Sequence, residues 1–270
     1  MSLHSVNNYD TVASDVFRLR SKVRFLIERQ QVLTLLQPLV AGARILDLGC
    51  GPGHYAEDLI GMGAEEVVGV DCSPSMLTVA GQRLQHHIQS GKAELLLADC
   101  GTPQVFAGGC FDLAFGAWLV DNADTRQGLV RFFETAFRNL RPQGRFVSVN
   151  APPTADPRKW VAEQDRVRPA PHGSGGLLYR VVEDLDGTGI RIRATGTSEF
   201  PDMTFEVCAW SQQAYEWAAR EAGFRGPLTW HVMRVPDKFL HGKQTVGSGS
   251  DDEIRSYDLV PRYGIMTCVK

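Results

Sequence analysis

The stretch ILDLGCGPG, residues 45–53, decides how this chain folds. Its first half is a short apolar run typical of a buried strand, and its second half is a glycine cluster. Glycines allow the backbone to lie against a ligand where a Cβ atom would clash. A helix that starts after such a turn points its unsatisfied N–H groups at the ligand. The stretch therefore predicts a strand, a ligand-binding loop and a helix, in that order.

Two features separate this loop from the pyrophosphate-binding loop of nicotinamide enzymes. In the pattern G-x-G-x-x-G the third glycine would fall at His54, but here it comes one residue early, at Gly53. Asp47 would also place a negative charge near the phosphates, whereas it suits a ligand that carries an ammonium group. A nicotinamide oxidoreductase is therefore disfavoured.

Strands and helices alternate from residue 43 to residue 149, which predicts a doubly wound, mostly parallel sheet. The expected strands are residues 43–48, 67–70, 94–98, 111–115 and 145–149. Helices are expected at about 54–62, after the N-cap pair Ser73-Pro74, and from Asp124, with Gln127 three residues on. An earlier helix is expected at about 14–37 from its apolar spacing and is closed by Pro38 and Gly42.

After Asn150 the pattern changes. Residues 151–176 are rich in proline and glycine, and two alternating runs, 177–184 and 189–197, meet at the hairpin signal Asp186-Gly187. With a third run at 204–210 they predict an inserted antiparallel ribbon. A helix from Ser211 to Ala222, two closing strands (228–235 and 262–269) and a loop at 242–252 complete the chain.

These elements predict a seven-stranded α/β fold in four parts. We expect an N-terminal helical lid (1–42), a cofactor-binding core (43–150), an inserted antiparallel substrate cap (151–210) and a C-terminal completion of the sheet (211–270).

Composition narrows the class of protein. The chain has 28 basic and 31 acidic residues and no basic run, so we do not expect it to bind nucleic acid. Its six cysteines show no C-x-x-C spacing, so we expect reduced thiols, no metal and a cytoplasmic location. Neither a signal peptide nor an apolar run of membrane-spanning length is found, so no membrane partner is expected. The sequence does not indicate an oligomeric state.

The residues around the glycine loop resemble those of class I S-adenosylmethionine-dependent methyltransferases. DLGCGPG (47–53) resembles motif I of that family, which implies that Asp47, Gly49, Cys50, Gly51 and Gly53 surround the methionine end of the cofactor.

Three further segments support this resemblance, which covers residues 43–149 most clearly. GVDCSPSML (69–77) is similar to the family's acidic loop, so Asp71 is expected to accept both ribose hydroxyls, with Cys72 beside it and Met76 on the adenine. ADC (98–100) resembles the adenine-edge site, with Asp99 and Cys100. LRPQGRF (140–146) resembles the turn before strand five.

The carboxyl ends of the strands should hold the reacting groups. The segment after strand four lacks the Asn/Asp-Pro-Pro-Tyr motif of family members that methylate amines in nucleic acids. Trp118 in this segment is expected either to line the adenine or substrate pocket or to be a partly buried packing residue. Tyr9 and His172 are the candidate catalytic residues, each with a packing or solvated role as the alternative. Residues 210–224 also resemble the ending of toxoflavin-type N-methyltransferases.

The sequence therefore predicts an enzyme that moves a methyl group from S-adenosylmethionine to N or O of a small metabolite and releases S-adenosylhomocysteine. Two alternatives stay open at this point. One is a methyltransferase that acts on protein or RNA, and the other is a non-catalytic module that only binds the cofactor.

Overall fold

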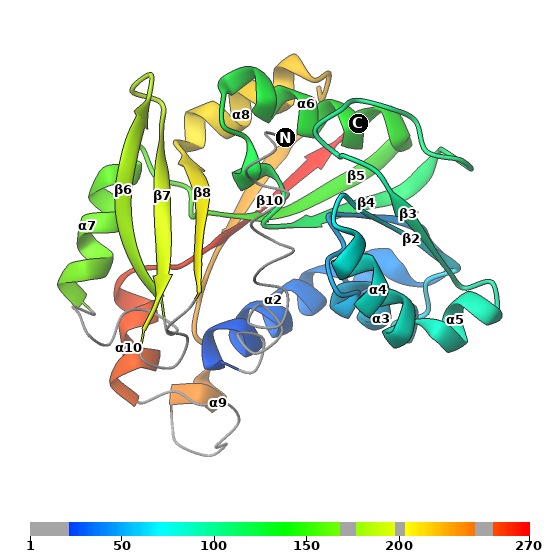
Figure 1. Cartoon of the computed structure of the whole chain (residues 1–270), viewed down its shortest axis with the longest axis horizontal. Coiled ribbons are helices and arrows are strands. Elements are labelled where there is room, and N and C mark those ends of the chain that lie inside the picture. Colours follow the sequence, from blue (N-terminus) through cyan, green and yellow to red (C-terminus); the bar gives the residue numbers. More distant parts are fainter. Residues whose placement is uncertain (1–21, 168–176, 198–202, 241–250) are drawn as a thin grey trace.

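The protein, described here by a computed structural model, is built on a seven-stranded sheet (Figure 1). The structure describes residues 22–167, 177–197, 203–240 and 251–270. The strand order is β3-β2-β1-β4-β5-β10-β9. Its strands are β1 (Arg44–Leu48), β2 (Glu66–Asp71), β3 (Ala93–Leu97), β4 (Phe111–Ala117), β5 (Leu140–Asn150), β9 (Leu228–Val232) and β10 (Gly264–Val269). Strands β1 to β5 pair in parallel and β10 pairs antiparallel with both neighbours, so the predicted sheet is confirmed.

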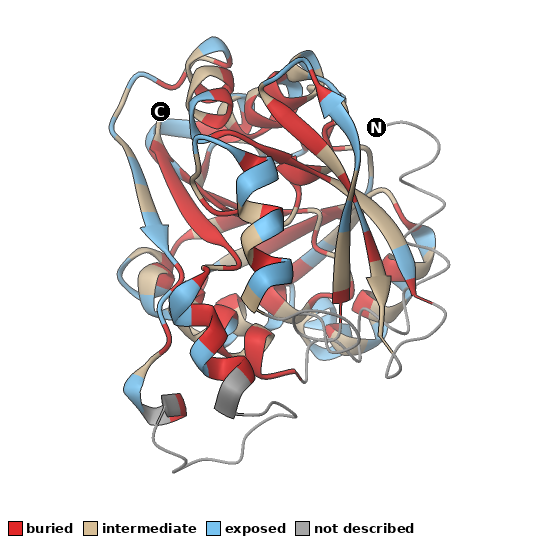
Figure 2. Cartoon of the chain, turned by 90° about the vertical axis from the view of Figure 1, so that its left-hand side faces the viewer, coloured by how far each residue is buried: buried red, intermediate tan, exposed pale blue. Residues whose placement is uncertain are grey.

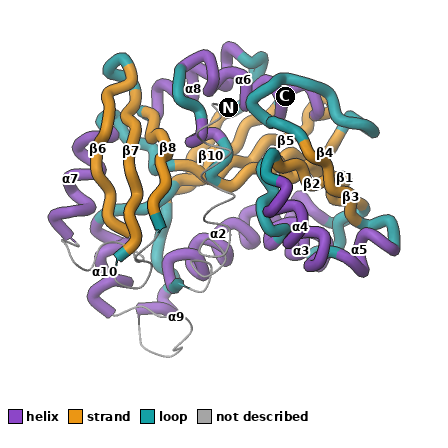
Figure 3. The backbone as a smooth tube through the Cα atoms, viewed as in Figure 1, coloured by secondary structure: helices purple, strands orange, loops and turns teal. Residues whose placement is uncertain are grey.

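Helices cover both faces of this sheet (Figures 1 and 3). The described helices are α2 (Val23–Val40), α3 (His54–Gly61), α4 (Pro74–Arg83), α5 (Gln85–Gln89), the 3-10 turn η1 (Val120–Asn122), α6 (Arg126–Asn139), α7 (Pro157–Val167), α8 (Gln212–Glu221), α9 (Asp237–Leu240) and α10 (Asp251–Leu259). One hydrophobic core joins α6 and α8 to the sheet, and a second joins α2 and α3 to its other face. Figure 2 shows the buried residues concentrated in the strands and on the inward helix faces. None of the helices in the described ranges is long and apolar enough to cross a bilayer.

The helix ends follow the expected capping chemistry, with one correction. Ser73 and Ser211 accept hydrogen bonds from the backbone N–H groups of Met76 and Ala214, each at 3.2 Å. The predicted start at Asp124 is wrong, because the hydroxyl of Thr125 accepts the N–H of Gly128 at 3.0 Å and caps α6. Asp124 and Thr125 are both residue types that cap helices. The sequence alone does not show which of the two is the last extended residue before the helix and therefore its N-cap.

Other element boundaries differ from the predicted ones, because polar or proline-containing segments that were predicted as turns or loops form helix or strand. Helix α2 runs through Pro38 to Val40, and β5 starts at Leu140, which pairs with Phe111 ahead of an irregularity in the strand pairing. The proline-rich region after Asn150 contains helix α7, which we did not predict. Asp156 starts α7 by accepting the N–H groups of Arg158 and Lys159. Helix α10 begins at Asp251, inside the predicted loop 242–252.

The inserted ribbon forms a separate sheet of three antiparallel strands, β6 (Leu177–Leu185), β7 (Gly189–Gly196) and β8 (Thr204–Trp210), as predicted. Asp186 and Gly187 have φ angles of 53° and 68°, as a tight hairpin between right-twisted strands requires. This sheet stands beside the central sheet, with α7 on its outer side (Figure 1). Its two ends lie together, because the N–H of Gln212 donates to the carbonyl of Thr154 at 2.8 Å. We call residues 151–210 the cap.

Gly189 pairs with Trp210, the last residue of the cap, whose side chain belongs to the core beside α6 and α8. A Cβ atom at residue 189 would lie 2.6 Å from Cε3 of Trp210, whose side chain is fully buried. Gly189→Ala is therefore expected to lower the free energy of unfolding by about 1–3 kcal/mol, the usual cost of overpacking. Urea titration measures this change.

The control for this substitution is Gly81→Ala in the interior of α4, where the nearest atom, Cδ1 of Leu95, is 4.0 Å away. It should raise the free energy of unfolding by about 0.5–1 kcal/mol, because alanine restricts the unfolded chain more than glycine does. Equal effects of the two substitutions would contradict the packing argument.

Candidate active site

One cavity extends from the carboxyl ends of the parallel strands to the cap. At the sheet end it is lined by Asp47, the glycine loop, Asp71 and Met76. At the cap end it is lined by aromatic side chains, among them Trp160, Tyr179 and Phe205. Most of the residues predicted to hold a cofactor therefore line the same space as aromatic residues of the segment predicted to cover a substrate.

The glycine loop adopts a backbone that only glycine tolerates easily. Gly49, Gly51 and Gly53 all have positive φ angles, of 69°, 52° and 79°. A Cβ atom at Gly51 would meet no atom within 4 Å, so the loop leaves open space beside that residue. The N–H groups of Gly49 and Cys50 both donate to the carbonyl of Val70, which ties the loop to β2.

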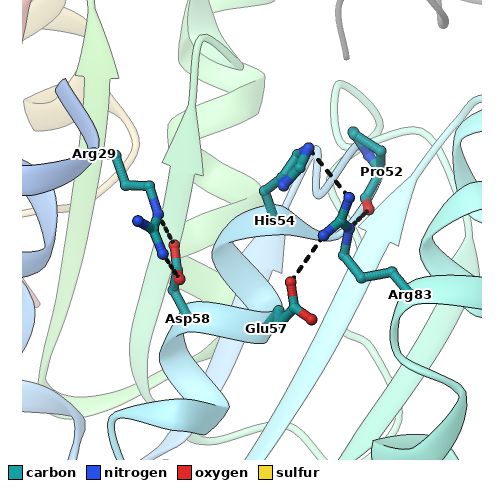
Figure 4. Close-up of polar contacts among 6 residues, drawn as sticks. All are labelled: Arg29, Pro52, His54, Glu57, Asp58 and Arg83. Atoms are coloured by element: carbon teal, nitrogen blue, oxygen red, sulfur yellow. Dashed lines mark hydrogen bonds and ion pairs between the residues drawn. The ribbon is translucent and has the colours of Figure 1, made fainter. Parts of the chain in front are cut away.

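Two arginines fix the helix that follows the loop (Figure 4). Arg83 of α4 donates from Nε to the carbonyl oxygen of Pro52 at 2.9 Å and pairs with Glu57 at 2.8 Å. Its Nη2 lies 3.4 Å from Nε2 of His54. On the other side of α3, Arg29 of α2 forms a two-bond ion pair with Asp58. The loop and the first turn of α3 are thus held by α4, while α2 is tied to α3.

The Asp71 carboxylate sits where a ligand with two neighbouring hydroxyls could use it. Its Oδ2 accepts the N–H of Gly51 at 2.8 Å and its Oδ1 accepts the N–H of Ser73 at 2.9 Å. A carboxylate oxygen can accept more than one hydrogen bond, so ribose hydroxyls could donate to Asp71 as well. Asp47, at the end of β1, is only 2% exposed and lines the same cavity, where its charge favours an ammonium group. The two carboxylates and the open space at Gly51 therefore fit S-adenosylmethionine.

The cysteines at this end of the cavity are neutral thiols. Burial, helped by the charges of nearby aspartates, raises the pKa values of Cys50 and Cys100 well above the usual range, and raises that of Cys72 to about 12. All three line the cavity. They shape the binding surface without adding charge.

Two predicted cofactor residues do not line the cavity. The carboxylate of Asp99 accepts the N–H of Gly101 at 2.8 Å and stabilises the turn after β3. Gly53 is the N-cap residue of α3 and packs near Ala80 and Leu84. The predicted contact between Asp99 and the adenine stays a prediction, whereas its neighbour Cys100 does line the cavity.

Trp118 lines the cavity and has a strained backbone conformation with a φ of 59°, while its contact with the adenine or the substrate stays a prediction. Its Nε1 donates to Oε2 of Glu28 at 3.0 Å, and the hydroxyl of Tyr55 donates to Oε1 at 2.9 Å. Glu28 is fully buried on α2. Through this carboxylate, helix α2 holds the indole of Trp118 in place.

Asp121 is a functional residue candidate that the sequence analysis did not select. It follows β4, is 1% exposed and lines the cavity. The hydroxyl of Tyr215 donates to its Oδ1 at 2.6 Å and the N–H of Ala151 to its Oδ2 at 2.8 Å. Burial outweighs these two hydrogen bonds and raises the pKa of Asp121 to about 7. A carboxyl group with that pKa can exchange a proton at neutral pH.

The two candidate catalytic residues, Tyr9 and His172, lie outside the described residues. His54 lines the cavity at the glycine loop. In the described part of the chain, no group of three or more His, Cys, Asp or Glu side chains is placed to hold a metal ion.

Comparisons with known proteins find similarity to methyltransferases. Residues 45–144 match the methyltransferase domain family. The chain is 36% identical over 149 residues to the 18S rRNA (guanine(1575)-N(7))-methyltransferase of Saccharomyces cerevisiae, covering 52% of this chain and 50% of that protein. It is 27% identical over 165 residues to the demethylmenaquinone methyltransferase of Leptospira interrogans, covering 58% of this chain and 64% of that protein. The chain thus spans about half the length of the first of these curated relatives.

A solved structure extends the similarity of the fold to nearly the whole chain. It is the complex between the Trm112 methyltransferase activator of Haloferax volcanii and its methyltransferase. The TM-score is 0.61, with 16% identity over 98% of this chain and 96% of the other chain. At this identity the match concerns the fold alone.

The fold is that of class I S-adenosylmethionine-dependent methyltransferases, and residues 45–144, which include the glycine loop, match the methyltransferase domain family. The matched segment contains the glycine loop and Asp71, the residues that fit S-adenosylmethionine.

Asp71→Ala is expected to weaken binding of S-adenosylhomocysteine by about 100-fold or more, because it removes two charge-assisted hydrogen bonds and the support of Gly51. Calorimetric titration measures the dissociation constant. The control is Asp184→Ala on the outside of the cap, which should leave the constant unchanged. Unchanged binding in Asp71→Ala would rule out the ribose assignment, and Asp99→Ala tests the adenine assignment in the same assay.

The pKa of Asp121 predicts how stability depends on pH. The folded protein holds the proton on Asp121 up to about pH 7, whereas an unfolded aspartate loses it near its usual value of 3.8. The stabilisation by this group is therefore complete below pH 3.8 and is lost as the pH rises to about 7, with a slope of at most about 1.4 kcal/mol per pH unit.

Urea titrations of the parent and of Asp121→Asn between pH 5 and pH 8 test this dependence. The parent should lose stability relative to the variant as the pH rises to 7, and the difference should then level off. The slopes are compared rather than the absolute values, because asparagine also changes the hydrogen bond to Ala151. Parallel curves would contradict the raised pKa.

Proposed function

We propose that this enzyme methylates N or O of a small, planar, largely apolar metabolite. The observation that carries the proposal is the single cavity that the cap and α2 enclose together with the cofactor residues. Most of its lining at the cap end is aromatic or aliphatic, from Trp118, Trp160, Tyr179, Phe205 and Val207. A flat ring fits between such side chains and is shielded from water.

S-adenosylmethionine supplies an electrophilic methyl group on a sulfonium, so the protein needs mainly to align the acceptor and exclude water. Asp47 and Asp71 hold the cofactor from the sheet side, and Trp118, fixed by Glu28, forms the wall between the cofactor and cap ends. Asp121 lines the cavity after β4 and, with a pKa of about 7, can take a proton from an acidic N–H or O–H acceptor.

A second candidate is an RNA acceptor, and the comparisons favour it over the small-molecule acceptor. Two curated relatives are named as 18S rRNA guanine-N7-methyltransferases. A guanine base is itself planar and could enter this cavity if it were turned out of the RNA. Against this candidate stand the acidic net charge of −3 and the cap over the cavity. One similar structure is a complex with the Trm112 activator, so this second candidate function also includes a protein partner.

A cytoplasmic location is part of the proposal. All six cysteines are free thiols in the structure, which suits a reducing compartment.

The first experiment separates these functions in two stages. Calorimetry with S-adenosylhomocysteine, and with NADH as the control, should show binding of the former alone. The protein is then incubated with methyl-tritiated S-adenosylmethionine and either a panel of small aromatic amines, phenols and lactams or total RNA. Label in the organic extract supports the small acceptor, and label in acid-precipitated RNA supports the second candidate. Cofactor binding without label in either fraction would leave the non-catalytic module.

Two neighbouring residues of β8 test the role of the cap. Phe205 lines the cavity, whereas Glu206 pairs with Arg193 on the outer side at 2.8 Å. Phe205→Ala should raise the KM for a small acceptor about tenfold or more, since burying a Phe side chain contributes about 1.5–3 kcal/mol. It should leave S-adenosylhomocysteine binding unchanged, and Glu206→Ala should alter neither. An unchanged KM in Phe205→Ala would place the acceptor outside the cap.

A further inference from the structure

The cap end of the cavity contains two buried guanidinium groups that neither the fold nor methyl transfer explains. Arg24 of α2 is 5% exposed and Arg262, just before β10, is 1% exposed. Both side chains line the cavity. A buried arginine is costly unless its charge and its donors are matched, so the partners of these two groups need to be identified.

Arg262 has few partners for its five donors. Its Nη2 donates to the hydroxyl of Ser256 at 3.4 Å, and its Cζ lies 5.3 Å from the ring centroid of Tyr257. Its Nε and Nη1 are buried and make no hydrogen bond. Arg24 is better satisfied, because its Nη1 donates to the hydroxyl of Tyr179 at 2.6 Å and its Cζ lies 5.4 Å from the ring centroid of Trp118.

The carboxylates nearby are engaged with other side chains. The two oxygens of Glu28 accept hydrogen bonds from Tyr55 and Trp118, and Glu253 accepts one from Tyr257. Among the described residues, no ion pair joins Arg24 or Arg262 to a carboxylate. Burial and repulsion from Arg24 lower the pKa of Arg262 to about 10, which keeps it cationic at neutral pH.

We propose that Arg262, with Arg24 beside it, forms an anion-binding subsite for the methyl acceptor, which is therefore a small planar carboxylate or similarly acidic compound. The guanidinium of Arg262 can bind a carboxylate through its Nε–Nη2 edge or its Nη1–Nη2 edge, and each edge includes one of the unpartnered donors. The aromatic lining accommodates the rest of the acceptor. This inference rests on the proposed function, since it names the chemical class of the acceptor.

The test uses two probes of the same shape that differ in charge, benzoate and benzamide. Their dissociation constants are measured by ligand-observed NMR on the full chain saturated with S-adenosylhomocysteine. Because a hydrogen bond to a charged group contributes about 1.5–3 kcal/mol, the parent should bind benzoate about tenfold or more tightly than benzamide. This comparison needs no substitution, so it holds even where a variant fails to fold.

Substitutions then test whether Arg262 causes the preference for benzoate over benzamide. Arg262→Met should abolish the preference for benzoate, and Arg262→Lys, which keeps the charge, should retain part of it. Arg193→Met, which removes an arginine from the outer side of the cap, should leave the preference intact. No preference for benzoate in the parent, whether both probes bind equally or neither binds, would overturn the subsite.

A full preference in a folded Arg262→Met variant would also overturn it. Failure of the proposed function is seen separately, as loss of S-adenosylhomocysteine binding or as label in RNA alone.

Discussion

The carboxylate of Asp71 is the point on which the arrangement of this site depends. It accepts one backbone N–H from the glycine loop after β1 and one from the N-cap residue of α4. Two successive strand-to-helix turns of a parallel sheet are thereby fixed to a single charged group. The same residue lines the cavity that fits the cofactor, so one side chain stabilises the local structure and is also proposed to bind the cofactor. A change at this position is therefore expected to affect both.

A second carboxylate, that of Glu28, connects structural elements toward the cap end of the cavity. It joins α2 to α3 through Tyr55 and to the segment after β4 through Trp118. Because α2 also contacts the cap through Phe25, the helix connects the two ends of the cavity. Among the described residues, four buried charged side chains line this cavity, those of Arg24, Asp47, Asp121 and Arg262, whereas the cores on both faces of the sheet are mainly apolar.

The sequence predicts well those parts in which chemistry is tied to local spacing. The glycine loop and the caps at Ser73 and Ser211 each depend on neighbouring residues, and the structure has them as expected. Asp71 lies at the end of β2, as its position in the sequence indicates, while its contact with ribose stays a prediction. Helix α7 was missed because prolines on both sides of it suggested a loop, although Pro157 is well placed in a first helical turn. Asp121 and Arg262 were missed for another reason. Their properties come from burial by segments far away in the chain, and no local signal reports it.

The way in which the cap joins the core has an evolutionary consequence. The insertion leaves the sheet after Asn150 and returns at Trp210, and the hydrogen bond between Gln212 and Thr154 keeps its two ends together. Because the two points at which the insertion joins the core stay in place, a segment of another length can replace it with little change in loop-closure entropy. Cap exchange would then give descendants of this chain new acceptors while the methyl donor and its binding residues stay unchanged.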